Sequence, residues 1–569
     1  MADIEENIQL KFITTSDIHG AIFQYDFIED EITSSSLAQI FTYITEQRQT
    51  PDQEIILLDN GDILQGQPIV FYSNLFYSKN NDFNHICSQV MNYMQYDTAT
   101  IGNHDIEAGH EVYDKLREDF NFPWLAANAI DIETGEPYFE PYTIIHRKGL
   151  KIAVLGLITP AIPMWLPESK WQGIEFEDMI ETAKKWVPYI KETEKPDLLV
   201  GLFHAGIDYT YNRQSPTTHR NENASILVAQ QVPGFDIIFA GHDHQENNLL
   251  FEDIEGNEVL LLNPKSLANF VSIATVEMRF NRETNKYEKY DITGINLQMN
   301  FCDTNSEFKA KFEKQINTVK KYVSEPIGSF TRSISSRESL FADTGFVDLI
   351  HRIQLDYTQA DISFAAPLSF DSVIRKGTIY VRDMFKLYKF DNLLYTIWLT
   401  GREIKDYLEF SYGLWFSTMK NINHTLLNFK QNHKGELVMA EKYYNFSSAA
   451  GIIYTVDLKA LYGQKIEIQS MASGEAFDFT KRYKVALNSY RGNGGGGHLI
   501  EGSGISHVEL HNRIITKSEK DVRSILMEWI KEKGEITPNA LGQWRAIPVS
   551  WWHKGRQKSL KILFNMKKN

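Results

Sequence analysis

The stretch Leu10–Gly20, with the sequence LKFITTSDIHG, places an apolar strand directly before a polar turn. Asp17 and His19 stand two positions apart in this turn, so in extended backbone their side chains point to the same side and can face one ion. Gly20 permits a tight turn there. A single Asp-x-His is more often a polar turn than a pair of metal ligands, so the interpretation needs support from elsewhere in the chain.

Four further motifs repeat the arrangement of an apolar strand followed by polar side chains and a glycine. They are Asn60-Gly61-Asp62, Gly102-Asn103-His104-Asp105, Phe203-His204-Ala205-Gly206 and Gly241-His242-Asp243-His244. In an open α/β sheet, the loops that follow the strands converge on one crevice. Carboxylate and amide oxygens together with imidazole nitrogens favour Zn, Mn, Fe, Co or Ni over Ca. The five motifs together therefore predict one metal cluster at strand ends.

The first half of the chain alternates short apolar strands with helical stretches, which predicts a layered α/β domain. We expect strands at 10–14, 54–58, 99–101, 152–157, 198–203 and 236–240, and helices near 36–48 and 176–191. Because 569 residues are too many for one hydrophobic core, we expect two domains. The predicted parts are a first domain at 1–300, a helical linker at 301–326 around the charged stretch Ser306–Ser324, a second α/β domain at 327–555 and a basic tail at 556–569 that is either a free end or an adhering helix.

Composition narrows the function. The net charge of −16 argues against binding of nucleic acid polymers, which requires basic surface. No apolar run reaches the roughly 18 residues that span a membrane. The acidic start, Met1–Glu6, does not read as a signal peptide, so the protein is either cytoplasmic or exported by a signal outside this sequence. Cys87 and Cys302 form no disulfide framework, and we expect two buried thiols rather than a bridge.

The five motifs resemble the signature of the calcineurin-like metallophosphoesterases in type and order. That order is Asp-x-His, Gly-Asp, Gly-Asn-His, His and Gly-His-x-His. The second half resembles the C-terminal domain of the 5'-nucleotidases. Nearly the whole chain is thus similar to the 5'-nucleotidase and 2',3'-cyclic-nucleotide 2'-phosphodiesterase family. The resemblance implies a four-layer metallophosphoesterase β-sandwich flanked by helices, with a second α/β substrate-binding domain. It also implies an active site in a cleft between domains, a common place for small-ligand pockets.

The resemblance further implies two divalent ions and a catalytic histidine. One ion would be held by Asp17, His19, Asp62 and His244, and the other by Asp62, Asn103, His204 and His242, so that Asp62 bridges both. His104 is the expected catalytic imidazole. Its partner carboxylate is Glu107 by spacing, while Asp105 is the alternative partner and otherwise caps the start of a helix.

The predicted chemistry is hydrolysis of phosphate esters. Two neighbouring cations lower the pKa of a bound water molecule, so that hydroxide forms near neutral pH and attacks phosphorus. The ions, Asn103 and His104 would stabilise the charge that develops on the phosphoryl oxygens. A protonated His104 would also assist the leaving oxygen, with its charged form favoured by the neighbouring carboxylate.

A nucleotide substrate needs flat faces for its base, and base–aromatic stacking contributes about 1–3 kcal/mol per base. By the resemblance, Tyr444 and Tyr490 sandwich the base, with Phe446 as the alternative to Tyr444. The glycine run that follows Tyr490 lets backbone approach a ligand closely. The remaining expected substrate contacts are Arg491, Gly495 and Gly496.

One segment departs from the 5'-nucleotidase pattern. Where many of these enzymes carry Gly-Gly-x-Arg, this chain reads Ala365-Ala366-Pro367-Leu368-Ser369-Phe370, and Arg375 lies nearby but not at the expected place. The departure favours 2',3'-cyclic-nucleotide 2'-phosphodiesterase/3'-nucleotidase activity over 5'-nucleotidase activity. The alternatives are a phosphatase or pyrophosphatase for nucleotide-sugars or non-nucleotide esters, and a non-catalytic nucleotide-binding protein. The resemblance also implies a periplasmic or secreted location.

Overall fold

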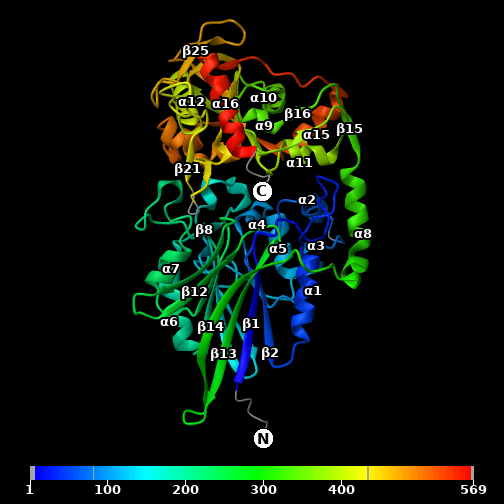
Figure 1. Ribbon diagram of the computed structural model, residues 1–569, viewed down its shortest axis with the longest axis vertical. Helices are drawn as coiled ribbons and strands as arrows, with labels where there is room; N and C mark the ends of the chain where they lie inside the picture. Colours follow the sequence, from blue (N-terminus) through cyan, green and yellow to red (C-terminus); the bar gives the residue numbers. More distant parts are fainter. Residues whose placement is uncertain (1–6, 81, 432–434, 565–569) are drawn as a thin grey trace. The chain divides into compact units, whose positions relative to one another are not determined.

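The computed structural model describes residues 7–80, 82–431 and 435–564. Contacts within the chain divide it into two compact units, one comprising Met1–Pro163 and Glu168–Lys321, the other Met164–Pro167 and Tyr322–Asn569. Both units mix helices and strands, as the α/β pattern predicts (Figure 1). None of the helices in the described ranges combines the length and the apolar character needed to cross a lipid bilayer.

Two six-stranded sheets form the centre of the first unit. In spatial order, the first sheet contains β14 (Lys286–Gln298), β13 (Phe270–Asn281), β1 (Asn7–Thr15), β2 (Gln53–Asp59), β3 (Thr98–Thr100) and β4 (Trp124–Leu125). The second contains β11 (Glu246–Glu252), β12 (Glu258–Pro264), β10 (Ile237–Ala240), β9 (Leu198–His204), β7 (Leu150–Ile158) and β6 (Tyr142–Arg147). Phe12 from the first sheet and Phe239 from the second lie 6.5 Å apart between ring centroids in one shared core. The sheets therefore pack face to face as a sandwich.

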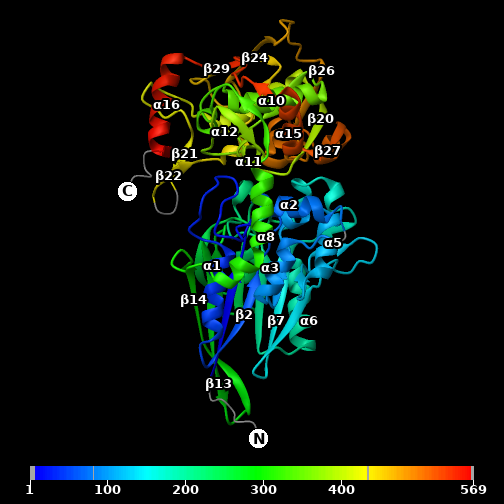
Figure 2. The same ribbon diagram turned by 90° about the vertical axis from the view of Figure 1, so that its right-hand side faces the viewer.

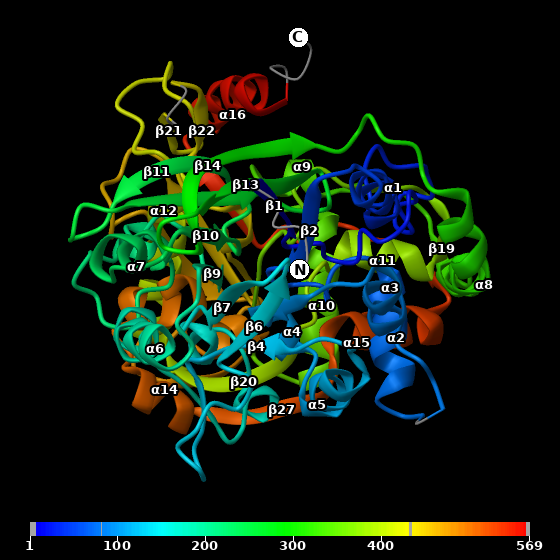
Figure 3. The same ribbon diagram turned by 90° about the horizontal axis from the view of Figure 1, so that it is seen from below.

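Helices cover the two outer faces of this sandwich, so the predicted four-layer arrangement is confirmed (Figure 3). On the second sheet, Ala183 of α6 and Val228 of α7 pack into a buried cluster with Phe203 of β9. On the first sheet, α1 packs along β2. The helices of this unit are α1 (Leu37–Arg48), α2 (Pro68–Tyr77), α3 (Ile86–Met94), α4 (Asn103–Glu107), α5 (His110–Asp119), α6 (Met179–Thr193) and α7 (Ser225–Gln231).

The charged stretch predicted as a helix forms α8 (Ser306–Val323). Phe308 and Phe312 of this helix are buried, and each ring lies 5.9 Å from the ring of Phe23. The helix thus packs on the first unit through an aromatic face and ends near the start of the second. The two thiols, Cys87 and Cys302, are free and buried, as expected from the cysteine count.

The second unit is built on a five-stranded sheet with its own core. In spatial order the sheet contains β23 (Ser448–Ala450), β17 (Ile362–Ala365), β26 (Arg482–Asn488), β20 (Leu393–Thr400) and β27 (Ile514–Asp521). Two three-stranded sheets accompany it, β19 (Gly377–Tyr380), β15 (Pro326–Phe330) and β28 (Glu535–Ile536), and β25 (Ile466–Met471), β24 (Ile452–Asp457) and β29 (Trp544–Ile547). Its helices include α10 (Gly345–Thr358), α11 (Val381–Leu387), α12 (Gly401–Trp415) and α15 (Val522–Lys533).

The last described element is the helix α16 (Val549–Phe564), drawn in red in Figure 2. The basic tail predicted at 556–569 begins inside this helix, and its residues 565–569 lie outside the described residues. Trp551, Trp552 and Leu560 pack against the core of the second unit. The described part of the tail is therefore an adhering helix rather than a free end.

Candidate metal centre and substrate pocket

The five motifs lie where their strands end. β1 and β2 run parallel to each other in the first sheet, as do β9 and β10 in the second, so within each sheet the turns that follow these strands emerge at the same edge. The backbone in these turns is unusual, because five of the predicted ligands have a positive φ, which is uncommon for residues other than glycine and marks functional sites. They are Asp17, His19, Asp62, His242 and His244, with φ between 48° and 70°.

Asp17, His19 and His244 form the first group of potential ligand atoms. The Nε2 atoms of His19 and His244 lie 3.0 Å apart, and His244 Nε2 lies 3.3 Å from Asp17 Oδ1. Burial is the largest of the effects that lower the pKa of His19 to about 3, so its ring is neutral and its nitrogen lone pair is available. Burial alone would raise the pKa of Asp17, but His244 lowers it, so the carboxylate is ionised. Both side chains are thus in the form that binds a cation.

Asp62, His204 and His242 form the second group. Asn103 joins them, because its Oδ1 lies 3.1 Å from His204 Nε2 and 2.8 Å from His242 Nδ1. Asp62 Oδ2 lies 3.2 Å from His204 Nε2 in this group and 4.0 Å from His19 Nε2 in the first. The Asp62 carboxylate therefore stands between the two groups, where a bridging ligand would stand.

The motif glycines explain how these side chains fit together. A Cβ atom on Gly102 would lie 2.2 Å from Asp62 Oδ1, and one on Gly241 would lie 2.3 Å from the Oγ of Ser16. A larger residue at position 102 would displace the Asp62 carboxylate, and one at position 241 would displace the Ser16 hydroxyl. The donor set of buried carboxylates, imidazole nitrogens and an amide oxygen fits two divalent ions of the Zn, Mn, Fe, Co or Ni class.

His104 lies beside this cluster and pairs with Glu107. Its Nδ1 lies 2.5 Å from Glu107 Oε2, and its backbone N–H donates to Asp62 Oδ1 at 2.7 Å. Burial lowers the pKa of His104, but the charges of Asp62 and Glu107 outweigh this effect and raise the pKa to about 9. The imidazole is therefore protonated at neutral pH and can donate a proton from its other nitrogen.

Asp105, the alternative partner of His104, has a different place. Its carboxylate accepts hydrogen bonds from the backbone N–H groups of Asp62, Ile63 and Leu64, each at 2.9 Å, and from that of Gly102 at 2.8 Å. Asp105 thus ties the loop after β2 to the start of α4. The structure corrects its assignment as a catalytic partner, because all four contacts position backbone.

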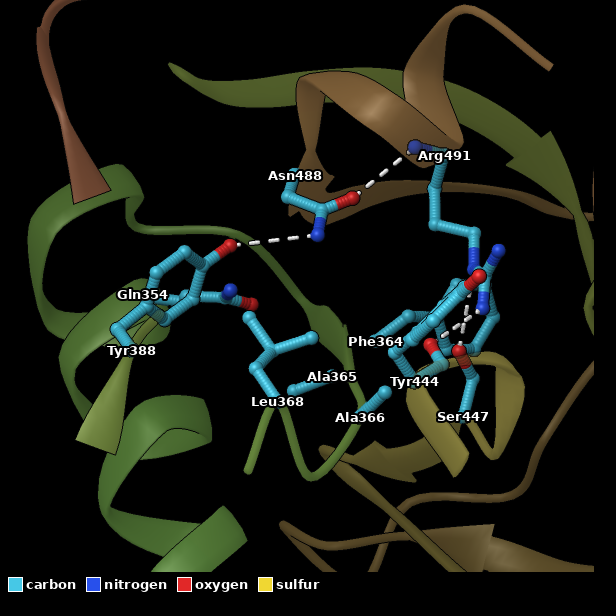
Figure 4. Close-up of a pocket in the computed structure, with 10 residues that line it drawn as sticks. All are labelled: Gln354, Phe364, Ala365, Ala366, Leu368, Tyr388, Tyr444, Ser447, Asn488 and Arg491. Atoms are coloured by element: carbon cyan, nitrogen blue, oxygen red, sulfur yellow. Dashed lines mark hydrogen bonds between the residues drawn. The ribbon is translucent and has the colours of Figure 1, made fainter. Parts of the chain in front are cut away.

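The second unit contains a pocket at the end of its central sheet (Figure 4). Of the predicted substrate residues, Tyr444 and Arg491 line it. The segment that departs from the 5'-nucleotidase pattern also contributes, through Ala365, Ala366 and Leu368, whereas Arg375 is exposed elsewhere. The lining residues that sequence reasoning missed are Gln354, Phe364, Tyr388, Ser447 and Asn488. These are ordinary residue types without a motif, so no signal in the sequence marked them.

Arg491 braces this pocket instead of projecting into it. The guanidinium is buried, and it donates from Nη2 to the carbonyl of Tyr444 at 3.0 Å and from Nη1 to that of Gly495 at 2.9 Å. A Cβ atom on Gly496 would lie 2.1 Å from Arg491 Nη1, and one on Gly495 would lie 2.5 Å from the ring of Tyr490. The glycine run is therefore needed for packing against these side chains, a reason that the sequence did not reveal.

The other two aromatic residues predicted to contact the base, Phe446 and Tyr490, do not line the pocket as Tyr444 does. Phe446 is only 2% exposed and stacks on Trp415 with ring centroids 4.9 Å apart, so it belongs to the core. This corrects its role as the alternative base-stacking residue, since it has no free face. Tyr490 is half-buried and lies outside the residues that line the pocket.

Comparison with known proteins agrees with this division of the chain. Residues 10–246 match the family model for calcineurin-like phosphoesterases, and residues 320–501 match that for the 5'-nucleotidase C-terminal domain. A 2',3'-cyclic-nucleotide 2'-phosphodiesterase/3'-nucleotidase of Haemophilus influenzae is 25% identical, over 97% of this chain and 89% of that protein. The trifunctional nucleotide phosphoesterase protein YfkN of Bacillus subtilis is also 25% identical, over 95% of this chain but 39% of that protein.

Among solved structures, a 5'-nucleotidase precursor from Thermus thermophilus has the same fold. It aligns with a TM-score of 0.65 at 18% identity, covering 95% of this chain and 100% of that chain. The two family models occur in the predicted order along the chain. The first matches residues of the first unit, and the second matches mainly residues of the second unit. The chain therefore belongs to the calcineurin-like phosphoesterases that carry a 5'-nucleotidase C-terminal domain.

Proposed function

We propose that this protein hydrolyses phosphate esters of nucleotides at a centre of two divalent ions. The observation that carries the proposal is the convergence of seven side chains from five strand ends, with Asp62 between two groups of ligand atoms. A pure binding protein has no need of the charged His104 beside them. The relatives named as nucleotide phosphoesterases support the same substrate class.

In this proposal, each ion has its own ligands and the two share one carboxylate. Asp17, His19 and His244 hold one ion, Asn103, His204 and His242 hold the other, and Asp62 bridges them. When bound, two such cations activate water and neutralise the charge of a phosphoryl group. The chain supplies a buried, preorganised set of donors, so little reorganisation is needed when substrate binds.

His104 acts as the general acid. Glu107 holds its Nδ1 at 2.5 Å, which leaves Nε2 to face the substrate. The ring lies 5.4 Å from that of His19, measured between centroids, so a phosphoryl group at the ions is within reach. A protonated imidazole there donates to a phosphoryl oxygen or to the leaving oxygen.

The second unit recognises the nucleoside part of the substrate. Tyr444 lines the pocket. Half-buried Tyr490, which lies outside the lining residues, is the proposed second face for the base by the family resemblance. At the position where many 5'-nucleotidases carry an arginine segment, this chain has Ala365 and Ala366, which line the pocket and offer no positive charge to a phosphate. By the family resemblance, this departure favours 2',3'-cyclic and 3'-nucleotides over 5'-nucleotides.

A substrate panel with added Mn or Zn tests the proposal. It compares 2',3'-cyclic, 3'- and 5'-nucleotides with an aryl phosphate and a nucleotide-sugar, each followed by kcat/KM. We expect the cyclic and 3'-nucleotides to be the best substrates. Preference for the nucleotide-sugar would instead identify a pyrophosphatase, equal rates on the aryl phosphate would remove the role of the base, and no turnover with bound ions would identify a binding protein.

We also propose that the protein acts in the periplasm or after secretion. The family resemblance supports this location. Fractionation of cells that express the complete natural gene tests it, and enzyme found only in the cytoplasmic fraction would contradict it.

A further inference from the structure

Two of the predicted histidine ligands, His204 and His19, hold the ring nitrogen that faces away from the cluster in the same way. His204 Nδ1 lies 2.6 Å from the carbonyl oxygen of Asn60, and His19 Nδ1 lies 3.2 Å from that of Gln65. In both rings a neutral backbone carbonyl accepts from Nδ1–H, so Nε2 is left for the cluster. Such partners fix the tautomer and orientation of a ligand.

His242 is turned the other way round. Its Nδ1 faces the cluster, 2.8 Å from Asn103 Oδ1, and its Nε2 lies 3.3 Å from Oε1 of Glu222. The partner of the outer nitrogen is therefore a carboxylate instead of a carbonyl. A carboxylate that accepts from the imidazole N–H makes the opposite nitrogen a stronger electron-pair donor.

Glu222 is held in place from several directions. Its side chain is buried, and its Oε2 accepts from Asn212 Nδ2 at 2.8 Å. Its backbone N–H donates to Gln214 Oε1 at 3.0 Å, and its carbonyl accepts from Thr159 Oγ1 at 2.9 Å. A buried carboxylate needs a partner of this kind, and the contact with His242 supplies one. The arrangement leaves Oε1 aimed at the His242 ring.

We propose that Glu222 is a positioning residue that strengthens binding of one of the two ions, the ion held by Asn103, His204 and His242. The inference rests on the proposed metal centre. It predicts that the two ions would respond differently to the loss of one carboxylate that is not among the predicted ligands. Among the interactions of the described residues, Glu222 contacts His242 but none of Asp17, His19 and His244.

The test measures the affinity of the full chain for Mn or Zn by competition with a chelator, without substrate. We expect Glu222→Ala to weaken one of two binding steps by about 10- to 100-fold and to leave the other unchanged. Glu222→Gln keeps an oxygen that accepts from Nε2–H but removes the charge, so its loss should be smaller. Glu175→Gln is the matched control, because exposed Glu175 pairs with Arg220, two residues before Glu222, and should change neither step.

Two results would overturn the inference. One is wild-type affinity for both ions in Glu222→Ala and Glu222→Gln. The other is equal weakening of both steps together with a lower melting temperature of the metal-free protein, which would show a structural role. A wild-type protein that binds two ions without hydrolysing nucleotides would refute the proposed function but not this inference, whereas a wild type that binds fewer than two ions would refute both.

Discussion

The metal centre of the first unit and the pocket of the second unit are built by opposite means. At the metal centre, polar side chains from five turns point at one another, and glycines beside Asp62 and Ser16 make room for them. At the pocket, the glycines make room for the side chains of Tyr490 and Arg491, and Arg491 packs into the protein and holds the backbone carbonyl of Tyr444. One site depends on the identity of its ligands, the other on the shape of its walls.

This difference has a consequence for mutation. Ligand chemistry tolerates almost no change of residue, because only a few side chains donate to a cation in the required geometry. A wall of ordinary residues tolerates more, because stacking and packing contribute in small increments. Substitutions should therefore abolish activity at the metal centre and adjust affinity at the pocket.

The largest effect is expected for Asp62→Ala. Its carboxylate lies within 4.0 Å of histidine nitrogens in both ligand groups, so its loss should weaken both ions together and bring hydrolysis to background. Metal content by mass spectrometry and phosphate release measure the two consequences. Asp291→Ala removes an exposed carboxylate on β14 and serves as the control. Two bound ions and full activity in Asp62→Ala would contradict the bridging role.

His104→Ala should separate chemistry from metal binding. The imidazole lies beside the ligand groups and donates protons, so we expect kcat to fall by about 10²- to 10⁴-fold while both ions remain. Glu107→Gln should lower kcat less, since His104 stays in place but loses the charge that favours its protonated form. Loss of the ions from His104→Ala would show that this residue acts as a ligand.

The same contrast explains how much the sequence predicted. The side chains that the structure brings together in the ligand cluster could be predicted because each follows an apolar strand and is of a restricted residue type, as with Asp17 and His204. Glu107 was preferred to Asp105 by spacing, but the sequence could not exclude Asp105, which directly follows His104. Only the structure shows that backbone N–H groups of the loop after β2 occupy the Asp105 carboxylate.

At the pocket the sequence predicted less. Tyr444 was predicted as a substrate contact and lines the pocket. The sequence could not show that neighbouring Phe446 is buried, because its burial depends on contact with Trp415, which is distant in sequence. Gln354 and Tyr388 carry no motif, and the glycine run at 494–497 looks the same whether it faces a ligand or the side chain of Arg491. Tertiary packing decides these cases, and residue type alone does not.

An intermediate effect is expected for Tyr444→Ala. Loss of one stacking face removes about 1–3 kcal/mol, or roughly 5- to 150-fold in KM for a nucleotide, with little change in kcat. Tyr444→Phe keeps the ring and should stay near the wild type. An aryl phosphate should be hydrolysed equally by all three proteins. Equal losses on the aryl phosphate and the nucleotide would show that the substitution disturbs the protein instead of the base contact.

The smallest effect contrasts the buried carboxylates of the two units. In the ligand cluster, burial would raise the pKa of Asp17, but the hydrogen bond with His244 lowers it, whereas in the second unit burial, and then the neighbouring carboxyl of Asp343, raise the pKa of Asp348. Asp348 is thus protonated in the folded protein, although it still accepts from the N–H of Leu541 at 2.6 Å.

Because the pKa of Asp348 is raised on folding, its stabilising contribution is complete below the unfolded value of 3.8 and is lost as the pH rises towards the folded value. Asp348→Asn mimics the neutral carboxyl at every pH. We expect the stability difference between the variant and the wild type to shift in favour of the variant as the pH rises from 5 to 8, without any change in hydrolysis. Urea unfolding at the two pH values measures the shift, and an identical pH dependence in both proteins would mean that Asp348 is ionised in the fold like the carboxylates of the metal centre.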